Sequence, residues 1–447
     1  MGLEGRHVVV VGLGRSGVAA ARLARALGAT VTATDSAPLE ALSSGARALD
    51  AVVVAGGHAG VPFTSADLVV VSPGVPRLSE LAAAEAAGVE VIGELELALR
   101  SVSAPIAAIG GTNGKSTVTT LVGAMAQAEW SRAFVGGNLG VPLAEAALEP
   151  WDAIVLEVSS FQLERAPSLR PRVAVLLNVT DDHLDRYASF EDYARAKGNA
   201  FVGQLPADAA VIPVGDPIVE AQARRGRARW VRFGAGGDYD LDAAGRQVCE
   251  RATGTRFDLR GVALHGRHNL ENAAAAIAAA RELGVGVPAV EAGLRAFRPL
   301  PHRMELVGEV AGVRYYDDSK GTNVGAAVTA LAGLEEPRAV LIAGGRDKLG
   351  SYEPLARVLR ERGRAVVVLG EAADRIADAV EGVVPVERAH DLETAVRAAT
   401  ARALPGDAVL LSPACSSFDM FKSYAERGER FAAAVRGLAG AHPGAPA

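Results

Sequence analysis

The sequence predicts an α/β protein of three domains, each built around a mainly parallel sheet. Short valine-rich runs, typical of strands buried on both faces, alternate with alanine- and arginine-rich stretches at helical spacing. Such alternation implies right-handed crossovers that place helices on both faces of a parallel sheet. At about 150 residues for each domain, a chain of 447 residues provides for about three. The alternation also starts again twice, after about residue 100 and after about residue 300, which gives the same number.

Residues 1–93 are predicted to form a Rossmann-like domain. A helix is expected over Val18–Leu27. The expected strands are His7–Val11, Val31–Thr34, Ala51–Val54 and Leu68–Val71.

Residues 94–299 are predicted to form a central P-loop-type ATPase domain, which ends where prolines interrupt the helical pattern at Arg298–Pro301. Asp208–His265 is rich in glycine and arginine and has strand-like residues in alternation. It is expected to form a small antiparallel excursion from the central domain. The other expected elements are the strands Ile106–Ile109, Ala153–Val158 and Val173–Leu177 and the helices Val118–Ala128, Phe190–Phe201 and Ala273–Leu283.

Residues 300–447 are predicted to form a second Rossmann-like domain. The last ten residues, 438–447, end in AHPGAPA and are expected to be disordered, as chain termini commonly are. The expected strands are Val313–Tyr316, Ala339–Ala343, Ala365–Leu369 and Ala408–Leu411.

Composition excludes several classes of protein. The 46 basic and 52 acidic residues give a net charge of −6, which argues against a general nucleic-acid binder. Only two cysteines, Cys249 and Cys415, are present, too few for a disulfide scaffold or a multi-cysteine zinc site. No stretch approaches the roughly 18 apolar residues of a membrane span, and no signal-peptide pattern opens the chain. A cytoplasmic protein is therefore expected.

Lysine is rare in this chain. Only five of the 46 basic residues are lysines: Lys115, Lys197, Lys320, Lys348 and Lys422. Where arginine supplies nearly all positive charge, the remaining lysines are candidates for sites that need a compact ammonium or a reactive amine. Chance scatter is the alternative.

A glycine-rich loop at Gly12–Gly17 follows the first expected strand and opens a helix. Glycines there let the backbone turn sharply and approach a diphosphate at the helix N-terminus. Asp35 ends the second strand, where an acid could accept from a ribose hydroxyl or a base, and Ser72 follows the fourth strand. The pattern favours a nucleotide site, without choosing NAD or another nucleotide. The alternative is that the glycines only pack a helix against a strand.

A second loop, GGTNGKST at Gly110–Thr117, follows strand Ile106–Ile109 and is typical of phosphate binding. Backbone N–H groups of such a loop cradle phosphates, Lys115 reaches the terminal phosphates, and Ser116 can ligate Mg²⁺. The general spacing requires a glycine where Ile109 stands, so the loop is a shortened variant. The sequence therefore predicts ATP binding, with a fortuitous turn as the alternative.

Polar residues end the next two strands of the central domain. Glu157 closes one strand, and the segment NVTDDHLD at Asn178–Asp185 closes the next. Two strands that end in metal-compatible side chains on one rim suggest more than one cation. Alternatively, Asp181, Asp182 and Asp185 only cap the following helix.

Further polar residues lie in helices and in the last domain. Asn269 and Asn272 share a helix face suited to the polar edge of a purine, with N-capping as the alternative. Three polar loops follow strands of the last domain, where open α/β sheets bind ligands, and a shared site explains them best. These loops are Asp317–Asn323, Gly344–Lys348 and Ser412–Asp419.

In this order the motifs resemble the ATP-dependent Mur ligases of bacterial cell-wall synthesis, over essentially the full chain. Within that family the resemblance is greatest to the members that add D-glutamate. It rests on GLGRSG with Asp35, on SPACSSFDMF, and on the absence of a DNPR-type motif. Two departures are Gly110, where the family often has threonine, and the third-domain loop, which reads GGRDK. Tyr424 is phenylalanine in some relatives. The motifs are GTNGKST, EVSSFQLE, NVTDDHLDRY, HNLENA, PHRMELV, DDSKGTN, GGRDK and LSPACSSFDMF.

The resemblance implies an activity. ATP would phosphorylate the terminal carboxylate of UDP-MurNAc-L-alanine, and the amine of D-glutamate would attack the acyl phosphate. The likeness assigns Lys115 to the transferred phosphate and implies two Mg²⁺ sites. Ser116 and Glu157 would serve one of them, and His183 and Lys197 the other. Lys197 would be N-carboxylated, which turns an amine into a carboxylate ligand.

The resemblance also assigns binding residues, with catalytic roles for Lys115, His183, Lys197 and Lys348. The ATP contacts would be Gly111, Thr112, Asn113, Gly114, Lys115, Ser116, Thr117, Asn269, Asn272, Arg303, Asp318 and Lys320. The UDP substrate would contact Gly14, Arg15, Ser16, Asp35, Ser72 and Asn138. D-glutamate would contact Thr322, Lys348, Ser417 and Tyr424, the last through its backbone.

A monomer without nucleic-acid or membrane partners is expected. Three alternatives stay open at this point. One is another member of the family, such as the L-alanine-adding enzyme. The others are an NAD-dependent oxidoreductase built on Gly12–Gly17 and a non-catalytic nucleotide-binding regulator.

Overall fold

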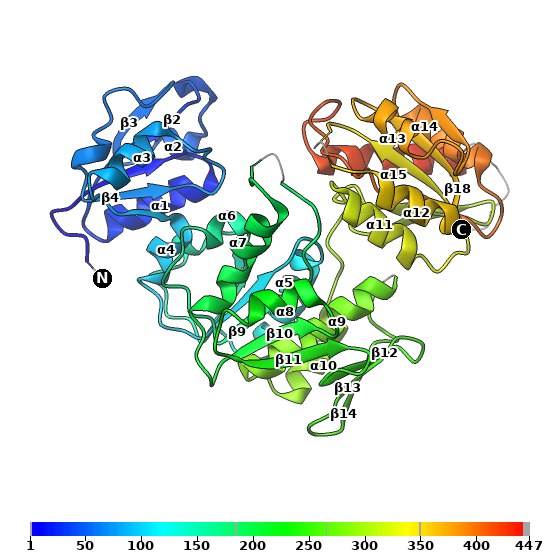
Figure 1. The fold of residues 1–447 in the computed structure, drawn as a ribbon, viewed down its shortest axis with the longest axis horizontal. Helices are drawn as coiled ribbons and strands as arrows, with labels where there is room; N and C mark the ends of the chain where they lie inside the picture. The colour runs from blue at the N-terminus through cyan, green and yellow to red at the C-terminus, as the bar shows by residue number, and fades with distance from the viewer. Residues whose placement is uncertain (1, 184–185, 265, 348–349, 441–447) are drawn as a thin grey trace.

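The computed structural model contains three α/β domains that follow one another along the chain (Figure 1). It describes residues 2–183, 186–264, 266–347 and 350–440. Each domain has its own sheet, and parallel pairing dominates all three, so the predicted fold class is confirmed. In Figure 1 the first and last domains lie on opposite sides above the central one.

The first sheet is wholly parallel, with strand order β3-β2-β1-β4-β5. Its strands are β1 His7–Val11, β2 Thr30–Asp35, β3 Val52–Ala55, β4 Leu68–Val71 and β5 Val91–Gly93. Its helices are α1 Arg15–Ala26, α2 Ser44–Arg47 and α3 Ser79–Ala86, with 3₁₀ turns at Leu39–Ala41 and Phe63–Ser65, and α4 Glu94–Leu99 leads into the central domain.

The central sheet has the order β14-β13-β12-β11-β10-β9-β6-β8-β7. Its strands are β6 Ile106–Gly110, β7 Ala133–Gly137, β8 Ala153–Glu157, β9 Val173–Leu176, β10 Ala209–Pro213, β11 Arg229–Gly234, β12 Tyr239–Asp242, β13 Gln247–Glu250 and β14 Thr255–Asp258. Its helices are α5 Lys115–Glu129, α6 Ser160–Leu163, α7 Phe190–Val202, α8 Pro217–Ala223, α9 Arg267–Leu283 and α10 Val287–Ala296, with a 3₁₀ turn at Leu143–Glu145.

The third sheet has the order β15-β16-β20-β17-β18-β19, and only the edge strand β15 runs antiparallel. Its strands are β15 Glu305–Val310, β16 Val313–Asp317, β17 Ala339–Gly344, β18 Gly363–Leu369, β19 Val386–Arg388 and β20 Ala408–Leu411. Its helices are α11 Val324–Gly333, α12 Glu353–Arg362, α13 Ala373–Ala379, α14 Leu392–Arg402 and α15 Tyr424–Gly440.

The region Asp208–His265 differs from the expected antiparallel excursion. β10, β11 and β12 join the central sheet in parallel, and only β13 and β14 pair antiparallel. A parallel neighbour requires a crossover connection, and α8 supplies one between β10 and β11. The prediction was therefore wrong for the first half of this region and right for its end.

The predicted disorder of 438–447 is also wrong at its start, since α15 continues to Gly440. The reason is packing, because Val435 is buried and Leu438, three residues on, lies against the same hydrophobic core. Residues 441–447 lie outside the described part of the chain.

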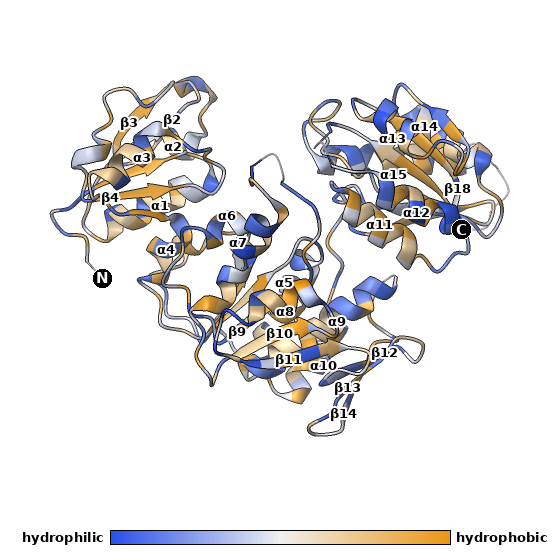
Figure 2. Ribbon diagram, viewed as in Figure 1, coloured by the Kyte–Doolittle hydropathy of each residue, from blue (hydrophilic) through white to orange (hydrophobic). Residues whose placement is uncertain are grey.

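The helix α9 is buried through most of its length. Seven alanines and Ile277 fill 273–280, and all eight side chains are fully buried. Small side chains let this helix lie close to the strands and to α5, which it contacts. In Figure 2 the hydrophobic residues, in orange, gather mainly in the strands inside each domain. Among the residues described, no helix is long and apolar enough to cross a membrane.

The junction between the first two domains contains a buried carboxyl group. Glu94 begins α4 and is 1% exposed; its Oε1 accepts from the Ala144 N–H at 2.9 Å. Its Oε2 has no hydrogen-bond partner among the described residues. Burial raises the pKa of Glu94 to about 7, and the nearby Glu145 adds to this. The folded protein therefore binds a proton that the unfolded chain releases near pH 4.5.

This pKa predicts a pH dependence of stability. Because the folded-state pKa of Glu94 is the higher one, stability falls as pH rises from about 4.5 to about 7. Glu94→Gln keeps an acceptor for Ala144 without the buried charge. At pH 8 we expect this variant to have a higher thermal unfolding midpoint and a free energy of unfolding larger by up to about 3 kcal/mol. At pH 4.5 we expect both quantities to change little.

Glu96 provides the matched control, because its buried carboxylate accepts from Arg100 and from Ser168. Glu96→Gln removes the charge of a carboxylate that has hydrogen-bond partners, and it should lower the thermal unfolding midpoint at both pH values. An unfolding midpoint of Glu94→Gln that is below the parent's at pH 8 would contradict the assignment.

Candidate active site

The backbone of the glycine-rich loop in the first domain is hydrogen-bonded to Asp35 and Ser72, two residues that were predicted to bind a nucleotide. Gly12 has a φ of +83°, and a Cβ on Gly17 would overlap the Gly12 carbonyl oxygen. Asp35 Oδ2 accepts from the Leu13 N–H at 2.6 Å, and the Ser72 hydroxyl donates to the Gly12 carbonyl at 2.7 Å. Each carboxylate oxygen can accept more than one bond, so Asp35 keeps capacity for a ligand.

These residues line a cavity of about 490 Å³ between the first and central domains. The six predicted UDP-substrate residues all lie in its wall: Gly14, Arg15, Ser16, Asp35, Ser72 and Asn138. A neighbouring cavity of about 620 Å³ shares Ser72 and Gln162 with it and continues along β4, β5 and α3. The two cavities together offer room for an extended ligand that lies across both domains.

The phosphate loop of the central domain connects β6 to α5. Gly114 has a φ of +84° and caps α5, which begins at Lys115, three residues earlier than the sequence predicts. A side chain at Gly114 would also collide with Asn272, so only glycine fits both the backbone and the neighbour. The first N–H groups of a helix lack intrahelical acceptors and are suited to phosphate oxygens.

Asn178 holds this loop in place. It follows β9, and its Oδ1 accepts from the Asn113 N–H at 2.9 Å while its Nδ2 donates to the Asn113 carbonyl at 3.2 Å. The N–H of Thr112 donates to the Asn178 carbonyl at 3.0 Å. Two of the predicted phosphate-binding N–H groups are thus occupied within the protein, which leaves the start of α5 as the donor surface.

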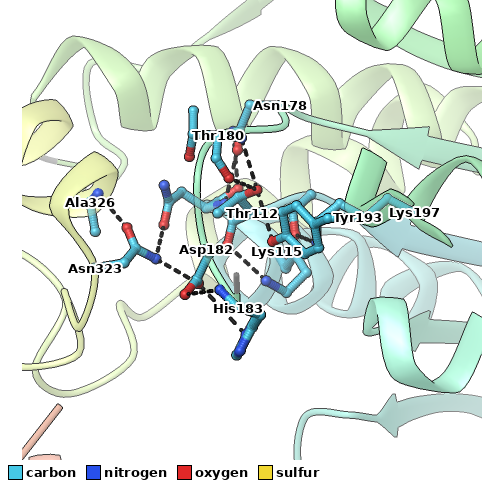
Figure 3. Close-up of polar contacts among 12 residues, drawn as sticks. Thr112, Lys115, Asn178, Thr180, Asp182, His183, Tyr193, Lys197, Asn323 and Ala326 are labelled. Carbon is cyan, nitrogen blue, oxygen red and sulfur yellow. Dashed lines mark hydrogen bonds and ion pairs between the residues drawn. The ribbon is translucent and has the colours of Figure 1, made fainter. Parts of the chain in front are cut away.

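Lys115 and Lys197 both place their amines against backbone carbonyls of this loop (Figure 3). Lys115 Nζ donates to the Thr112 carbonyl at 2.9 Å, and Lys197 Nζ, on α7, donates to the Gly111 carbonyl at 2.7 Å. The Lys197 side chain is only 3% exposed. Burial lowers the pKa of both amines, and the nearby carboxylates of Glu157 and Asp182 act in the opposite direction.

Glu157 ends β8 beside the phosphate loop. Its Oε1 accepts from Asn138 Nδ2 at 2.6 Å, whereas its Oε2 is buried without a hydrogen-bond partner among the described residues. A buried carboxylate oxygen with no donor is costly unless a cation or another ligand satisfies it. The residues present therefore fit a divalent cation at this point.

His183 lies on the loop after β9, with a φ of +56° that is unusual for a side-chain-bearing residue. The His183 ring lies edge-on to the Phe161 ring, with 4.9 Å between the ring centres. The backbone N–H of His183 donates to Asp182 Oδ1 at 3.0 Å. The alternative that Asp182 only caps the following helix is wrong, because Ser189 caps α7 and Asp182 lies beside His183 and Asn323 (Figure 3). Asp185 lies outside the described residues.

The third domain reaches the phosphate loop through Arg303. Its Nη2 donates to Ser116 Oγ at 2.8 Å. Asp318 accepts from the Ser412 hydroxyl at 2.7 Å, and burial raises the pKa of Asp318 to about 7. Lys320 places its Nζ 3.8 Å from the centre of the Tyr424 ring. The bond from Arg303 to Ser116 therefore joins the third domain to the phosphate loop of the central one.

Eight of the twelve predicted ATP residues, from both domains, line a cavity of about 70 Å³, whereas Gly111, Thr112, Lys115 and Ser116 do not. α9 begins at Arg267, so Asn269 and Asn272 lie inside the helix, and the alternative that they cap it is wrong. Asn272 Nδ2 donates to Asn269 Oδ1 at 3.0 Å, and the pair faces the loop. Predicted residues in the wall are Asn113, Gly114, Thr117, Asn269, Asn272, Arg303, Asp318 and Lys320.

The predicted amino-acid residues lie on loops after neighbouring strands. Thr322 follows β16, and Ser417 follows β20, which pairs with β16 in parallel. Tyr424 begins α15, and its carbonyl accepts from the Ser319 hydroxyl at 2.8 Å. That carbonyl is therefore partly used within the protein. Lys348 lies outside the described residues.

The sequence interpretation assigned no role to several residues of the site. Asn178 and Asn323 hold the phosphate loop, and Tyr193 shares a hydrogen bond of 3.1 Å with the Thr112 hydroxyl. Arg186 donates to the Pro73 carbonyl of the first domain at 3.1 Å and lies 4.0 Å from the centre of the Phe161 ring. Asn178, Arg186 and Asn323 had a signal in the sequence, since they stand within the motifs NVTDDHLDRY and DDSKGTN, whereas Tyr193 lies outside both.

Three family models match successive parts of the chain. A Mur ligase MurD-like N-terminal domain matches residues 6–93, and a Mur ligase middle domain matches 109–280. The model described as Mur ligase, glutamate ligase domain, matches 302–415.

Curated relatives match over nearly their whole length. The UDP-N-acetylmuramoylalanine--D-glutamate ligase of Geobacter metallireducens is 48% identical, covering 98% of this chain and 99% of its own. That of Anaeromyxobacter dehalogenans is also 48% identical, covering 96% and 97%.

Solved structures share the fold at low identity. A MurF ligase from Thermotoga maritima in complex with ADP has a TM-score of 0.61 at 20% identity, covering 99% of this chain and 96% of its own. A pseudomurein peptide ligase type C from Methanothermus fervidus has a TM-score of 0.60 at 18% identity, covering 91% and 96%.

Proposed function

This chain belongs to the Mur ligase family, and we propose on that premise that it joins D-glutamate to UDP-N-acetylmuramoyl-L-alanine. The ligation uses ATP and belongs to the synthesis of peptidoglycan precursors for the cell wall. The observation that carries the proposal is the meeting of Lys115, Glu157 and Arg303 around one phosphate loop. The family assignment favours a ligase over the oxidoreductase suggested by Gly12–Gly17.

The reaction needs positioned charge more than a protein nucleophile. The substrate carboxylate attacks the γ-phosphorus of ATP, ADP departs, and an acyl phosphate remains. The D-glutamate amine then forms the C–N bond, loses a proton, and phosphate leaves. Lys115, at the start of α5, stabilises the charge on the transferred phosphoryl group together with the helix N–H groups.

Ser116 and Glu157 are the residues that would hold one Mg²⁺, and His183 and Lys197 would serve a second. Mg²⁺ would supply charge neutralisation between the phosphates. Support comes from the orphaned Glu157 Oε2 and from the burial of Lys197 beside Asp182 and Glu157. An N-carboxylated Lys197 keeps one N–H, so its bond to the Gly111 carbonyl survives the modification.

Substrate placement follows from the cavities. The UDP portion would occupy the cavity formed by Gly14, Asp35 and Ser72, and the purine would lie against Asn269 and Asn272. D-glutamate would lie near Thr322, Ser417 and Tyr424 of the third domain, with Lys348 as a further contact. We also infer a monomer that works in the cytoplasm on small-molecule substrates alone.

An amino-acid panel tests the proposal. The protein is incubated with ATP, Mg²⁺ and UDP-MurNAc-L-alanine, and phosphate release is measured with each amino acid in turn. We expect D-glutamate to be the best substrate by at least about tenfold, because a buried polar pocket rejects analogues that leave its groups unpaired. L-glutamate is the matched control. Faster release with another amino acid would overturn the assignment, and UDP-MurNAc with L-alanine tests the L-alanine-adding alternative.

A further inference from the structure

The first turn of α11 approaches the phosphate loop and the His183 loop closely. Asn323 caps α11, because its Oδ1 accepts from the Ala326 N–H at 2.7 Å. A Cβ on Gly325 would lie 2.8 Å from the Thr180 hydroxyl, closer than real side chains come. The third domain therefore meets the central one here with almost no space between them.

The amide of Asn323 links three elements at once. While its Oδ1 caps α11, its Nδ2 donates to Asp182 Oδ2 at 3.0 Å and to Asn113 Oδ1 at 3.3 Å (Figure 3). Asn113 belongs to the phosphate loop and Asp182 precedes His183. The Asn323 side chain is 9% exposed, so these bonds form largely out of water, where donor and acceptor must match.

We propose that Asn323 is a positioning residue that holds the amino-acid-binding domain in register with the phosphate loop and the His183 loop. This inference rests on the proposed ligase function, since only a two-domain reaction needs that register. It joins an acyl phosphate made on the central domain to an amine bound by the third. A small displacement between the two partners costs rate far more than affinity.

Asn323→Asp separates this role from helix capping. Aspartate caps a helix as well as asparagine, so the bond from Ala326 persists. Its second oxygen, however, replaces the donor and faces two acceptors, Asp182 and Asn113. We expect kcat to fall by about 10- to 100-fold, with the KM for UDP-MurNAc-L-alanine within twofold of the parent.

Two more variants test the contacts of Asn323 by different changes. Asn323→Ser keeps a capping oxygen and removes the amide Nδ2 donor without adding charge, and Gly325→Ala pushes the helix away with Asn323 unchanged. Both should lower kcat and leave that KM alone. The controls in the same domain are Asp391→Asn, which changes the cap of α14, and Gly437→Ala, which meets no neighbour.

Thermal unfolding of each variant shows whether the fold is retained. A kcat within twofold of the parent in folded Asn323→Asp, Asn323→Ser and Gly325→Ala would overturn the inference. Equal losses in the controls would reduce Asn323 to a structural cap and overturn it too. Because the parent is run with D-glutamate in the same assay, failure of the proposed function shows separately as an inactive parent.

Discussion

Lys197→Arg is expected to abolish ligation while leaving ATP binding intact. The Lys197 amine is almost fully buried against the Gly111 carbonyl, and a guanidinium is larger, permanently charged and unable to take up CO₂. We expect kcat to fall by at least about 10³-fold, or about 4 kcal/mol of transition-state stabilisation. Phosphate release with D-glutamate and calorimetric titration with ATP measure the two properties.

Lys422→Arg is the matched control, because Lys422 is exposed at the surface. Its kcat should stay within twofold of the parent. In Lys197→Ala, added formate or acetate should restore part of the activity by supplying the missing carboxylate. Full activity in Lys197→Arg would show that neither an amine nor its carboxylated form is needed there.

Glu157→Gln is expected to cause the second large loss of ligase activity. The substitution keeps the shape and an acceptor for Asn138, but it removes the charge of a buried carboxylate whose other oxygen has no donor among the residues that the structure describes. We expect the Mg²⁺ concentration for half-maximal activity to rise by about 10- to 100-fold. We also expect kcat at saturating Mg²⁺ to fall by about 10²-fold. Initial rates over a series of Mg²⁺ concentrations measure both.

Glu336 offers a matched control for this change. It too is buried with one unpartnered oxygen among the described residues, and it accepts from Tyr316 and Arg314 in the third domain. Glu336→Gln should lower thermal stability without altering the Mg²⁺ dependence. A Glu157→Gln enzyme with the parent's Mg²⁺ requirement would refute the metal assignment.

The sequence predicted which candidate site residues stand at the carboxyl ends of parallel strands. Ser72, Lys115 and Glu157 each follow or end a short apolar run, and parallel strands bring such ends to one edge of a sheet. The strand β1 was predicted to the residue, whereas α1 begins at Arg15, within the predicted loop and three residues before the predicted helix start at Val18. Glycines and short motifs carry this information locally, so it survives without knowledge of the tertiary structure.

The contacts between loops could not be predicted in the same way. Asn178, Asp182 and Asn323 act through partners that lie 65 to 210 residues away along the chain. Their own neighbours indicate only polar loops. The parallel pairing of β10 to β12 was missed for a similar reason, since alternation of side chains does not reveal which direction a neighbouring strand runs.

The alanine-filled helix α9 has a consequence for how this protein can change over generations. Its buried face sets the distance between the helix and the sheet, and that distance fixes where Asn269 and Asn272 stand at the helix start. A single added methylene at 273–280 would push the helix outward and move both amides. Under the proposed function, sequence drift in this interior segment would change the affinity for nucleotide, although its own side chains are fully buried.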